Sequence, residues 1–236
     1  MSTAYSPIDQ RLLLTNVEWP TYERVLRDLE GRHLRFNFDR GQLEIMTVSA
    51  EHERVKKLLA RLLEVLTEVL NIPVLSLGNT TFRREDAARG LEPDECWYIA
   101  HESQMRARDE IDLVIAPPPD LVIEIEISRS VVDRMEIYAA LGVPEVWRCD
   151  GRTLIVEVLA DDGRYIESDR SPAFPHVPLS GIVEHVNQTK RALSGRFASG
   201  LGSLLRSHNA AGQRRRCVQA GFSETRTSEA CAEARP

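Results

Sequence analysis

The sequence predicts a mixed α/β fold in which a central β-sheet is flanked by helices. One observation is a hairpin pattern at 33–48, and a second is the long amphipathic helical pattern that follows it. The third is a strand with one strongly apolar face at 119–128, which is followed by a helical pattern at 131–141 and by more short strands. Strands and helices that interleave in this way favour a sheet with helices packed against it.

The N-terminal part is predicted to hold two helices with the hairpin between them. Residues 21–30 have apolar positions at helical spacing, and Gly31 ends that pattern. Residues 33–48 alternate around a glycine-containing turn, as the two strands of a hairpin do. Ser49 stands where an N-cap would, and an apolar stripe then continues to about Leu70.

Beyond Pro73 the sequence predicts short strands and one more helix. The candidate strands are 74–77, 80–83, 95–99, 111–115, 121–127, 143–149, 152–159 and 165–167. The first two flank Gly78-Asn79, which is a hairpin signal. Residues 101–110 are polar and are interpreted as a loop, and the helix at 131–141 is closed by Gly142.

The domain organisation follows from composition. The chain has 236 residues, 42% of them hydrophobic and 28% charged, which is ordinary for a folded protein. Residues 1–20 are interpreted as an N-terminal extension and 21–200 as one domain. Residues 206–236 hold six arginines against three glutamates and few large apolar side chains, so 201–236 are predicted to be a disordered basic tail.

Charge and cysteine usage exclude several classes of protein. The net charge of −6 gives no overall field that attracts phosphate, so nucleic-acid binding would need a local patch or a bound cation. We expect no membrane span and no signal peptide, because the apolar stretches are short and the N-terminus lacks a basic region before an apolar run. The four cysteines form no C-x-x-C pair, which argues against a zinc site and favours the cytoplasm.

The segment Pro119–Ser128, PDLVIEIEIS, carries the strongest chemical signal. Read as a strand, it places Glu124 and Glu126 side by side on one face and three isoleucines on the other. Adjacent carboxylates repel each other, and a hard cation such as Mg²⁺ removes that repulsion. The alternative is a solvated edge strand, which is the commoner setting for two glutamates spaced in this way. Glu44, on the hairpin, is likewise interpreted as part of a solvated strand face.

A second acidic position comes earlier in the chain. Asp94 follows Pro93 at the start of the strand predicted at 95–99. Alone, the pair is ordinary turn chemistry, since proline and aspartate both favour turns. Together with the later Glu-x-Glu strand, it is similar to the two-strand carboxylate layout of metal-dependent phosphodiesterases.

These motifs resemble the PD-(D/E)XK restriction-endonuclease-like superfamily. Within it, the chain is similar to a large bacterial family of restriction-endonuclease domains, abundant in cyanobacteria and formerly a domain of unknown function. The matching segments are 41–46 with Glu51-His52, GLEPDECWYI at 90–99, 118–128, DRMEIYAALGVPEVWRCDG at 133–151 and YIESDRSPAFP at 165–175. The resemblance covers roughly residues 10–200 and implies a restriction-endonuclease-like fold, with a central mixed β-sheet, flanking helices, and an N-terminal helix and hairpin.

The resemblance also implies roles for individual residues. Asp94 and Glu124 match the metal-binding acids, but the superfamily lysine two residues after the second acid is here Glu126. In this family a basic residue on the next helix replaces that lysine, and Arg134 occupies that place. Because arginine keeps its proton, it can orient water or stabilise charge on phosphate but is a poor general base. Glu126 is then expected to be a third metal ligand or a proton acceptor.

His52 opens the long helix and has two interpretations. It could assist near the metal or the phosphate, or it could be a polar residue of the first helical turn.

The function expected from these observations is hydrolysis of DNA phosphodiester bonds by an endonuclease that uses Mg²⁺ or Mn²⁺, with RNA left open as a substrate. Cutting both strands favours a homodimer. The alternative is a catalytically silent nuclease fold that binds nucleic acid or protein, and the missing lysine favours it.

Overall fold

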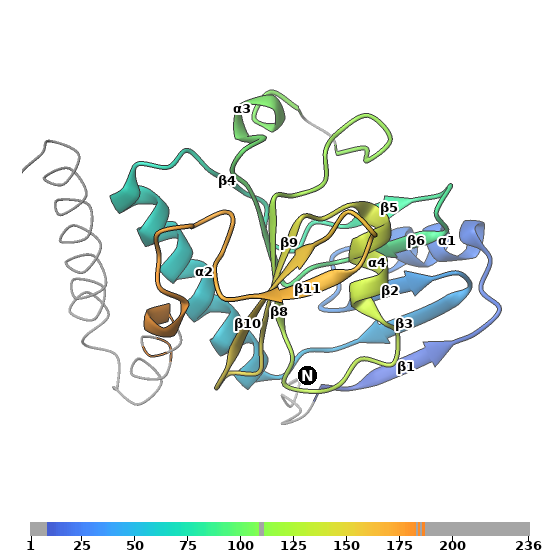
Figure 1. Cartoon of the computed structure of the whole chain (residues 1–236). Coiled ribbons are helices and arrows are strands. Elements are labelled where there is room, and N and C mark those ends of the chain that lie inside the picture. The colour runs from blue at the N-terminus through green and yellow to red at the C-terminus, as the bar shows by residue number, and fades with distance from the viewer. Residues whose placement is uncertain (1–8, 109–110, 183, 185, 187–236) are drawn as a thin grey trace, which may run out of the picture.

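The computed structural model describes residues 9–108, 111–182, 184 and 186, and it contains two β-sheets (Figure 1). A five-stranded sheet has the order β1-β3-β2-β6-β5, and a six-stranded sheet has the order β11-β10-β9-β8-β7-β4. The helices are α1 (Trp19–Asp28), α2 (Ala50–Leu70), α3 (Glu102–Met105) and α4 (Arg134–Leu141). The strands are β1 (Arg11–Leu14), β2 (Arg35–Asp39), β3 (Gln42–Met46), β4 (Leu75–Ser76), β5 (Phe82–Arg84), β6 (Arg89–Leu91), β7 (Glu95–Tyr98), β8 (Leu121–Ile125), β9 (Glu145–Cys149), β10 (Leu154–Leu159) and β11 (Tyr165–Ser168).

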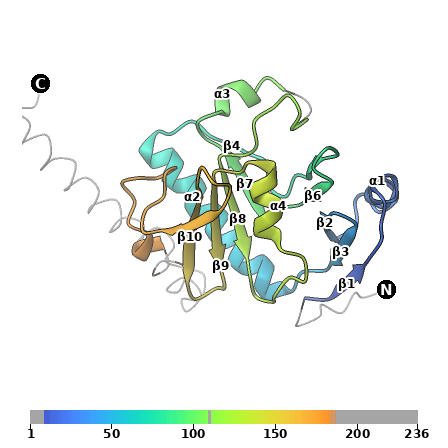
Figure 2. The same ribbon diagram turned by 45° about the vertical axis from the view of Figure 1, so that its right-hand side comes forward.

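The six-stranded sheet is mixed, which confirms the predicted fold class. Its strands β8 and β9 are parallel, and all its other neighbours are antiparallel. Helix α2 covers one face and α4 the other (Figure 2). The alternation of β8 sends Ile123 and Ile125 into the core under α2 and Val122 into the core under α4. Glu124 therefore lies on the α4 face, between the sheet and that helix.

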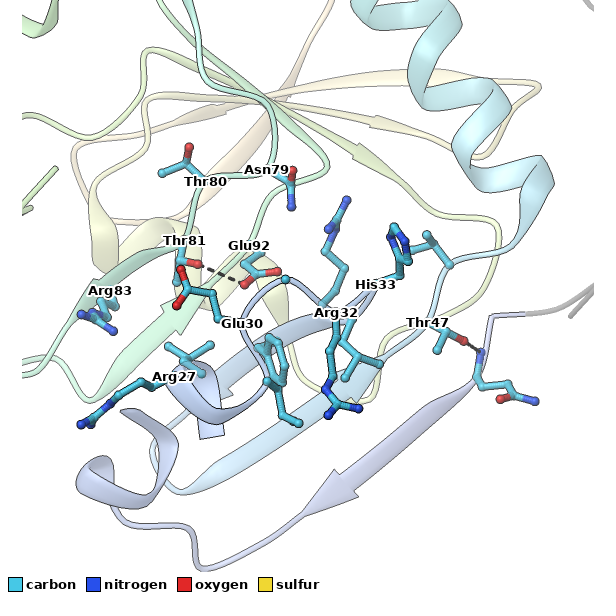
Figure 3. Close-up of a pocket in the computed structure, with 18 of the residues that line it drawn as sticks. Arg27, Glu30, Arg32, His33, Thr47, Asn79, Thr80, Thr81, Arg83 and Glu92 are labelled. Carbon is cyan, nitrogen blue, oxygen red and sulfur yellow. Dashed lines mark hydrogen bonds between the residues drawn. The ribbon is translucent and has the colours of Figure 1, made fainter. Parts of the chain in front are cut away.

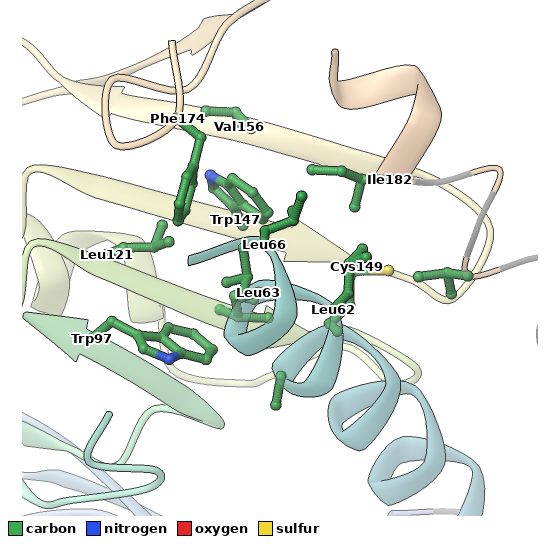
Figure 4. Close-up of a cluster of buried hydrophobic side chains, with 14 of the residues drawn as sticks. Leu62, Leu63, Leu66, Trp97, Leu121, Trp147, Cys149, Val156, Phe174 and Ile182 are labelled. Carbon is green, nitrogen blue, oxygen red and sulfur yellow. The ribbon is translucent and has the colours of Figure 1, made fainter. Parts of the chain in front are cut away.

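Helix α2 forms where its sequence pattern predicts. The Ser49 side chain caps it by accepting a hydrogen bond from the backbone N–H of His52 at 3.3 Å. Its apolar stripe packs on the sheet against two tryptophans, Trp97 of β7 and Trp147 of β9 (Figure 4). Burial of this many large side chains supplies most of the stability of a domain of this size. The site described below is built around the first turn of this helix.

The five-stranded sheet extends the predicted hairpin. Strands β2 and β3 pair around Arg40 and Gly41, both at positive φ, as a tight turn requires. Strand β1 pairs with β3 at one edge, so part of the segment interpreted as an extension, residues 1–20, belongs to the sheet. The tail at 201–236 lies outside the described residues.

Two strand predictions after Pro73 are wrong. The segments around Gly78-Asn79 do not pair as a hairpin, because β4 pairs with β7 and β5 pairs with β6 in the other sheet. The stretch predicted as a strand at 111–115 is a turn, in which Asp112 accepts hydrogen bonds from the backbone of Val114 and Ala116. Local aspartate bonding of this kind competes with strand pairing. None of the helices in the described ranges combines the length and apolar character of a membrane span.

Gly90 on β6 lies against the buried ring of Tyr22, which stacks on Phe38 with ring centroids 4.6 Å apart. A Cβ at this position would overlap the Tyr22 hydroxyl and lie 3.1 Å from Cβ of Arg83. We expect Gly90→Ala to lower the free energy of unfolding by about 1–3 kcal/mol, the usual cost of overpacking. Urea denaturation measures this, and an unchanged midpoint would contradict it.

Candidate active site

The sheet brings Asp94 and Glu124 together, as the sequence predicts. Strand β7 pairs with β8 so that Glu95 lies opposite Ile123, which places Asp94 beside Glu124. Oδ2 of Asp94 accepts a hydrogen bond from the backbone N–H of Ile125 at 2.8 Å. Both carboxylates are only 2% exposed. Two buried like charges at neighbouring positions of adjacent strands need a compensating positive charge.

Part of that charge comes from His52. Its Nε2 lies 2.8 Å from Oδ1 of Asp94, and its Nδ1 lies 3.6 Å from Oδ2 of Asp9. Burial lowers the pKa of His52, but the hydrogen bonds and negative charges of the two aspartates outweigh it and raise that pKa to about 9. Burial likewise raises the pKa of Asp94, and the hydrogen bond from His52 with the charges of His52 and Arg134 lowers it to about 2.

Asp9 is a member of the site that sequence reasoning missed. It is buried, and it also accepts hydrogen bonds from the backbone of Ser49 and the hydroxyl of Ser128, both at 2.7 Å. Burial raises the pKa of Asp9, but these bonds and the contact with His52 outweigh it and lower that pKa. Asp9 therefore ties the chain before β1 to the start of α2 and to the segment after β8. A lone aspartate in a polar stretch gives no local signal of such contacts.

Arg134 supplies the second positive charge. It lies in the first turn of α4, and its Nη2 donates to Oε1 of Glu124 at 2.6 Å, while its Nη1 lies 2.5 Å from Oε2. The Tyr138 hydroxyl, one helical turn later, also donates to Oε1. Burial raises the pKa of Glu124 to about 8, against the opposing effect of Arg134. The family resemblance implies a basic site residue at Arg134, and the structure places this side chain in direct contact with Glu124.

A buried glutamate in the other sheet positions the segment that leads to α4. Glu44, which is fully buried, accepts hydrogen bonds from the Ser130 hydroxyl at 2.7 Å and the Val131 backbone at 2.8 Å. Its interpretation as a solvated residue is wrong, because the chain after β8 folds over it. The Asp133 side chain then caps α4 by accepting from two backbone N–H groups of the first turn.

Glu126 lies apart from the two buried carboxylates. Strand β8 ends at Ile125, and the Glu126 carboxylate forms a two-pronged ion pair with Arg148 of β9, at 2.8 and 2.9 Å. Arg148 also binds Glu157 of β10 at 2.6 Å. Within the described ranges, no cluster of three or more histidine, cysteine or acidic side chains is arranged to hold a metal ion. A role for Glu126 as a ligand stays a prediction.

Asp94 and Glu124 nevertheless fit a hard cation. Their oxygens are of the type that Mg²⁺ prefers, and Mg²⁺ is commonly bound by one or two carboxylates together with substrate phosphates and water. Oε2 of Glu124 is buried, and among the described residues none donates a hydrogen bond to it, although it lies close to Arg134. Such an atom has bonding capacity left for a ligand. The donor chemistry of the pair is thus that of a divalent-cation site, and Arg134 supplies a guanidinium beside it.

Comparison with known proteins gives the family of the chain. No curated protein matches it. A crystal structure from Anabaena variabilis, described as that of "a putative nuclease belonging to DUF820", matches with a TM-score of 0.47 and 14% identity, over 64% of this chain and 90% of that one. The model of the Uma2 family matches residues 19–183, well over half of the chain. The chain therefore belongs to this family, which is described as "Putative restriction endonuclease".

Proposed function

We propose that the protein is a metal-dependent nuclease that hydrolyses phosphodiester bonds of DNA. The observation that carries the proposal is the pair of buried carboxylates, Asp94 and Glu124, on adjacent strands beside a buried arginine. The family of the chain supports a nuclease, and the donor set supports Mg²⁺ or Mn²⁺ as the cofactor. Action on DNA, a homodimeric state and a place in the cytoplasm are expectations from the sequence.

The residues have distinct tasks in this proposal. Asp94 and Glu124 would hold the cation, which when bound lowers the pKa of water and polarises a phosphate. Arg134 would face the scissile phosphate and stabilise the negative charge that develops as the attacking oxygen approaches. His52 holds Asp94 in one orientation through its 2.8 Å contact. Tyr138 and Arg134 together orient Glu124.

Metal binding tests the carboxylate pair without any assumption about substrate. We expect Mn²⁺ titrated into chelator-treated protein to bind saturably in calorimetry, and Asp94→Asn or Glu124→Gln to weaken binding at least tenfold, because each removes a charged ligand. Glu167→Gln, on an exposed position of β11, is the matched control. If either site variant bound Mn²⁺ as tightly as the wild type, the assigned ligands would be wrong.

The same titration with Glu126→Gln examines the third carboxylate. Weaker binding in this variant would mean that Glu126 leaves Arg148 and joins the site when the ion enters. Unchanged binding would mean that the ion pair with Arg148 is its whole role.

A silent nuclease fold is the second candidate function. The observation that favours it is that Glu126, which pairs with Arg148, stands where the superfamily has its lysine, while Arg134 is held in an ion pair with Glu124. Arginine cannot serve as a proton acceptor in a protein. Cleavage of DNA that requires both a divalent ion and Glu124 would exclude this candidate.

A further inference from the structure

A large cavity is lined by residues of the five-stranded sheet and of the segments that flank it, among them Arg32, Arg83 and Glu92 (Figure 3). It has a volume of about 1200 Å³ and is bounded by the turn between α1 and β2, the start of α2, residues 79–83 and Glu92. Glu92 joins it to the site, since its side chain lines the cavity while its backbone oxygen accepts a hydrogen bond from Arg134 at 3.1 Å. Glu53 of the cavity wall follows His52 directly in α2.

Positive charge is available at the cavity surface. Arg27 at the end of α1, Arg32 in the turn that follows it and Arg83 of β5 line the cavity, and all three side chains are exposed. In the part of the chain that the structure describes, none of the three takes part in an ion pair. Free guanidinium groups at the mouth of a cavity are well suited to bind phosphate oxygens.

The interior of the cavity contains polar groups with bonding capacity to spare. Glu92 is 8% exposed, and Oε1 accepts a hydrogen bond from the Thr81 hydroxyl at 3.0 Å, the one side-chain bond to this carboxyl within the described ranges. Arg35, also in the wall, has a buried Nε that finds no hydrogen-bond partner in the described part of the chain. Buried groups of this kind are normally satisfied, which points to a bound molecule.

We propose that this cavity binds a single-stranded stretch of nucleic acid, with its phosphates on Arg27, Arg32 and Arg83 and unstacked bases in the interior beside Glu92 and Arg35. The inference rests on the proposed function, because it takes the bound strand to be the substrate of the nuclease. It assigns substrate-binding residues outside the carboxylate pair and names the form of nucleic acid that they accept.

The shape of the cavity favours a single strand over a duplex. Pockets of roughly 300–1,000 Å³ enclose one ligand of drug size, so about 1200 Å³ has room for more than one nucleotide unit. Duplex DNA is read by a helix or ribbon that protrudes into a groove about 12 Å wide. A concave site with buried polar groups reaches bases only when they are unstacked, as in single strands.

Fluorescence anisotropy tests the inference on the full chain in chelator, where cleavage is suppressed. The probes are a labelled single-stranded DNA of 12 nucleotides and the duplex of the same sequence. We expect the single strand to bind at least tenfold more tightly. The double charge reversal Arg32→Glu with Arg83→Glu should weaken binding of the single strand at least tenfold. The slope of log K against log salt concentration should also become less steep, by about 0.7 for each phosphate that an arginine no longer neutralises.

The matched control is Arg152→Glu with Arg164→Glu. These arginines are exposed on turns of the other sheet, outside the cavity, and their reversal changes the net charge by the same amount. We expect this control to bind as the wild type does. Equal weakening of both double variants, equal or tighter binding of the duplex, or no binding of either probe would overturn the inference.

Two further variants separate this inference from the proposed function. Glu92→Gln, an isosteric change in the interior, should alter the preference among single strands of thymine, adenine and cytosine, which a purely structural role would leave unchanged. Glu167→Gln, at an exposed position of β11 outside the cavity, should bind the single strand as the wild type does. If the strand binds through the cavity arginines but is never cleaved with Mg²⁺ or Mn²⁺, the nuclease function fails and the cavity assignment stands. If the wild type cleaves DNA but the cavity variants bind the strand undiminished, the cavity assignment fails and the nuclease function stands.

Discussion

Replacing Arg134 by alanine is expected to lower the rate of metal-dependent DNA cleavage by about 10²–10³, the usual effect of removing one donor to a developing oxyanion. Replacement by lysine should leave the rate within about tenfold of the wild type. The reason is that the proposed role of Arg134 is electrostatic. A lysine keeps the positive charge next to Glu124, although it loses the two-pronged contact that the guanidinium makes.

The stability of the two variants must be measured alongside the rates. Arg134 is buried against Glu124, and removal of one partner of a buried ion pair costs about 3–5 kcal/mol. Cleavage should therefore be compared only at temperatures where melting curves show each variant to be folded. Arg164→Ala, a change on an exposed turn, is the control for general effects of losing an arginine.

The outcome also discriminates between roles for Arg134. A lysine variant as inactive as the alanine variant would show that guanidinium geometry, not charge, is required. A lysine variant whose rate rises with pH, unlike the wild type, would show that a group able to lose its proton improves the reaction. An alanine variant that is folded and fully active would remove Arg134 from the mechanism.

Local patterns predicted where two residues of the candidate site lie, Glu124 on a strand and His52 at the start of a helix. The period-2 alternation of β8 placed Glu124 opposite the isoleucine face, and the N-cap Ser49 placed His52 in the first turn of α2. The match of 19–183 to the family model confirms the resemblance that suggested Asp94 and Arg134. Tyr138 falls one helical turn after Arg134, and this spacing brings its hydroxyl to the same carboxylate.

Contacts between distant segments could not be predicted in this way. Asp9 and His52 are 43 positions apart, and they meet only because β1 pairs with β3. Glu44 is buried by the loop after β8, and the residues around Glu44 in the sequence do not indicate this contact. The separation of Glu126 from Glu124 depends on where β8 ends and on Arg148 of the neighbouring strand. From the sequence of this segment alone, the alternation of side chains continues past Ile125 and places Glu126 on the same face as Glu124.

Replacing His52 by alanine is expected to lower the free energy of unfolding of the metal-free protein by about 3–5 kcal/mol, because it leaves two buried carboxylates without their cation. Asp9 and Asp94 are 8% and 2% exposed, so neither can be solvated in compensation. Urea denaturation at pH 7 measures the effect. His33→Ala, at an exposed position, is the control and should cost less than about 0.5 kcal/mol.

The pH dependence of stability provides an independent check on the same cluster. The pKa of folded His52, about 9, lies above its ordinary value of 6.5. Its stabilising charge is therefore fully present below pH 6.5 and is lost as the pH rises through 9. The difference in unfolding free energy between the wild type and His52→Gln should shrink over this window. The double variant His52→Gln with Asp9→Asn should recover part of the loss at pH 7, since it removes one unpaired charge. A difference that stays constant from pH 6.5 to about 9 would mean that His52 is neutral in the folded protein, and Asp94 would then depend on Arg134 alone for its compensating charge.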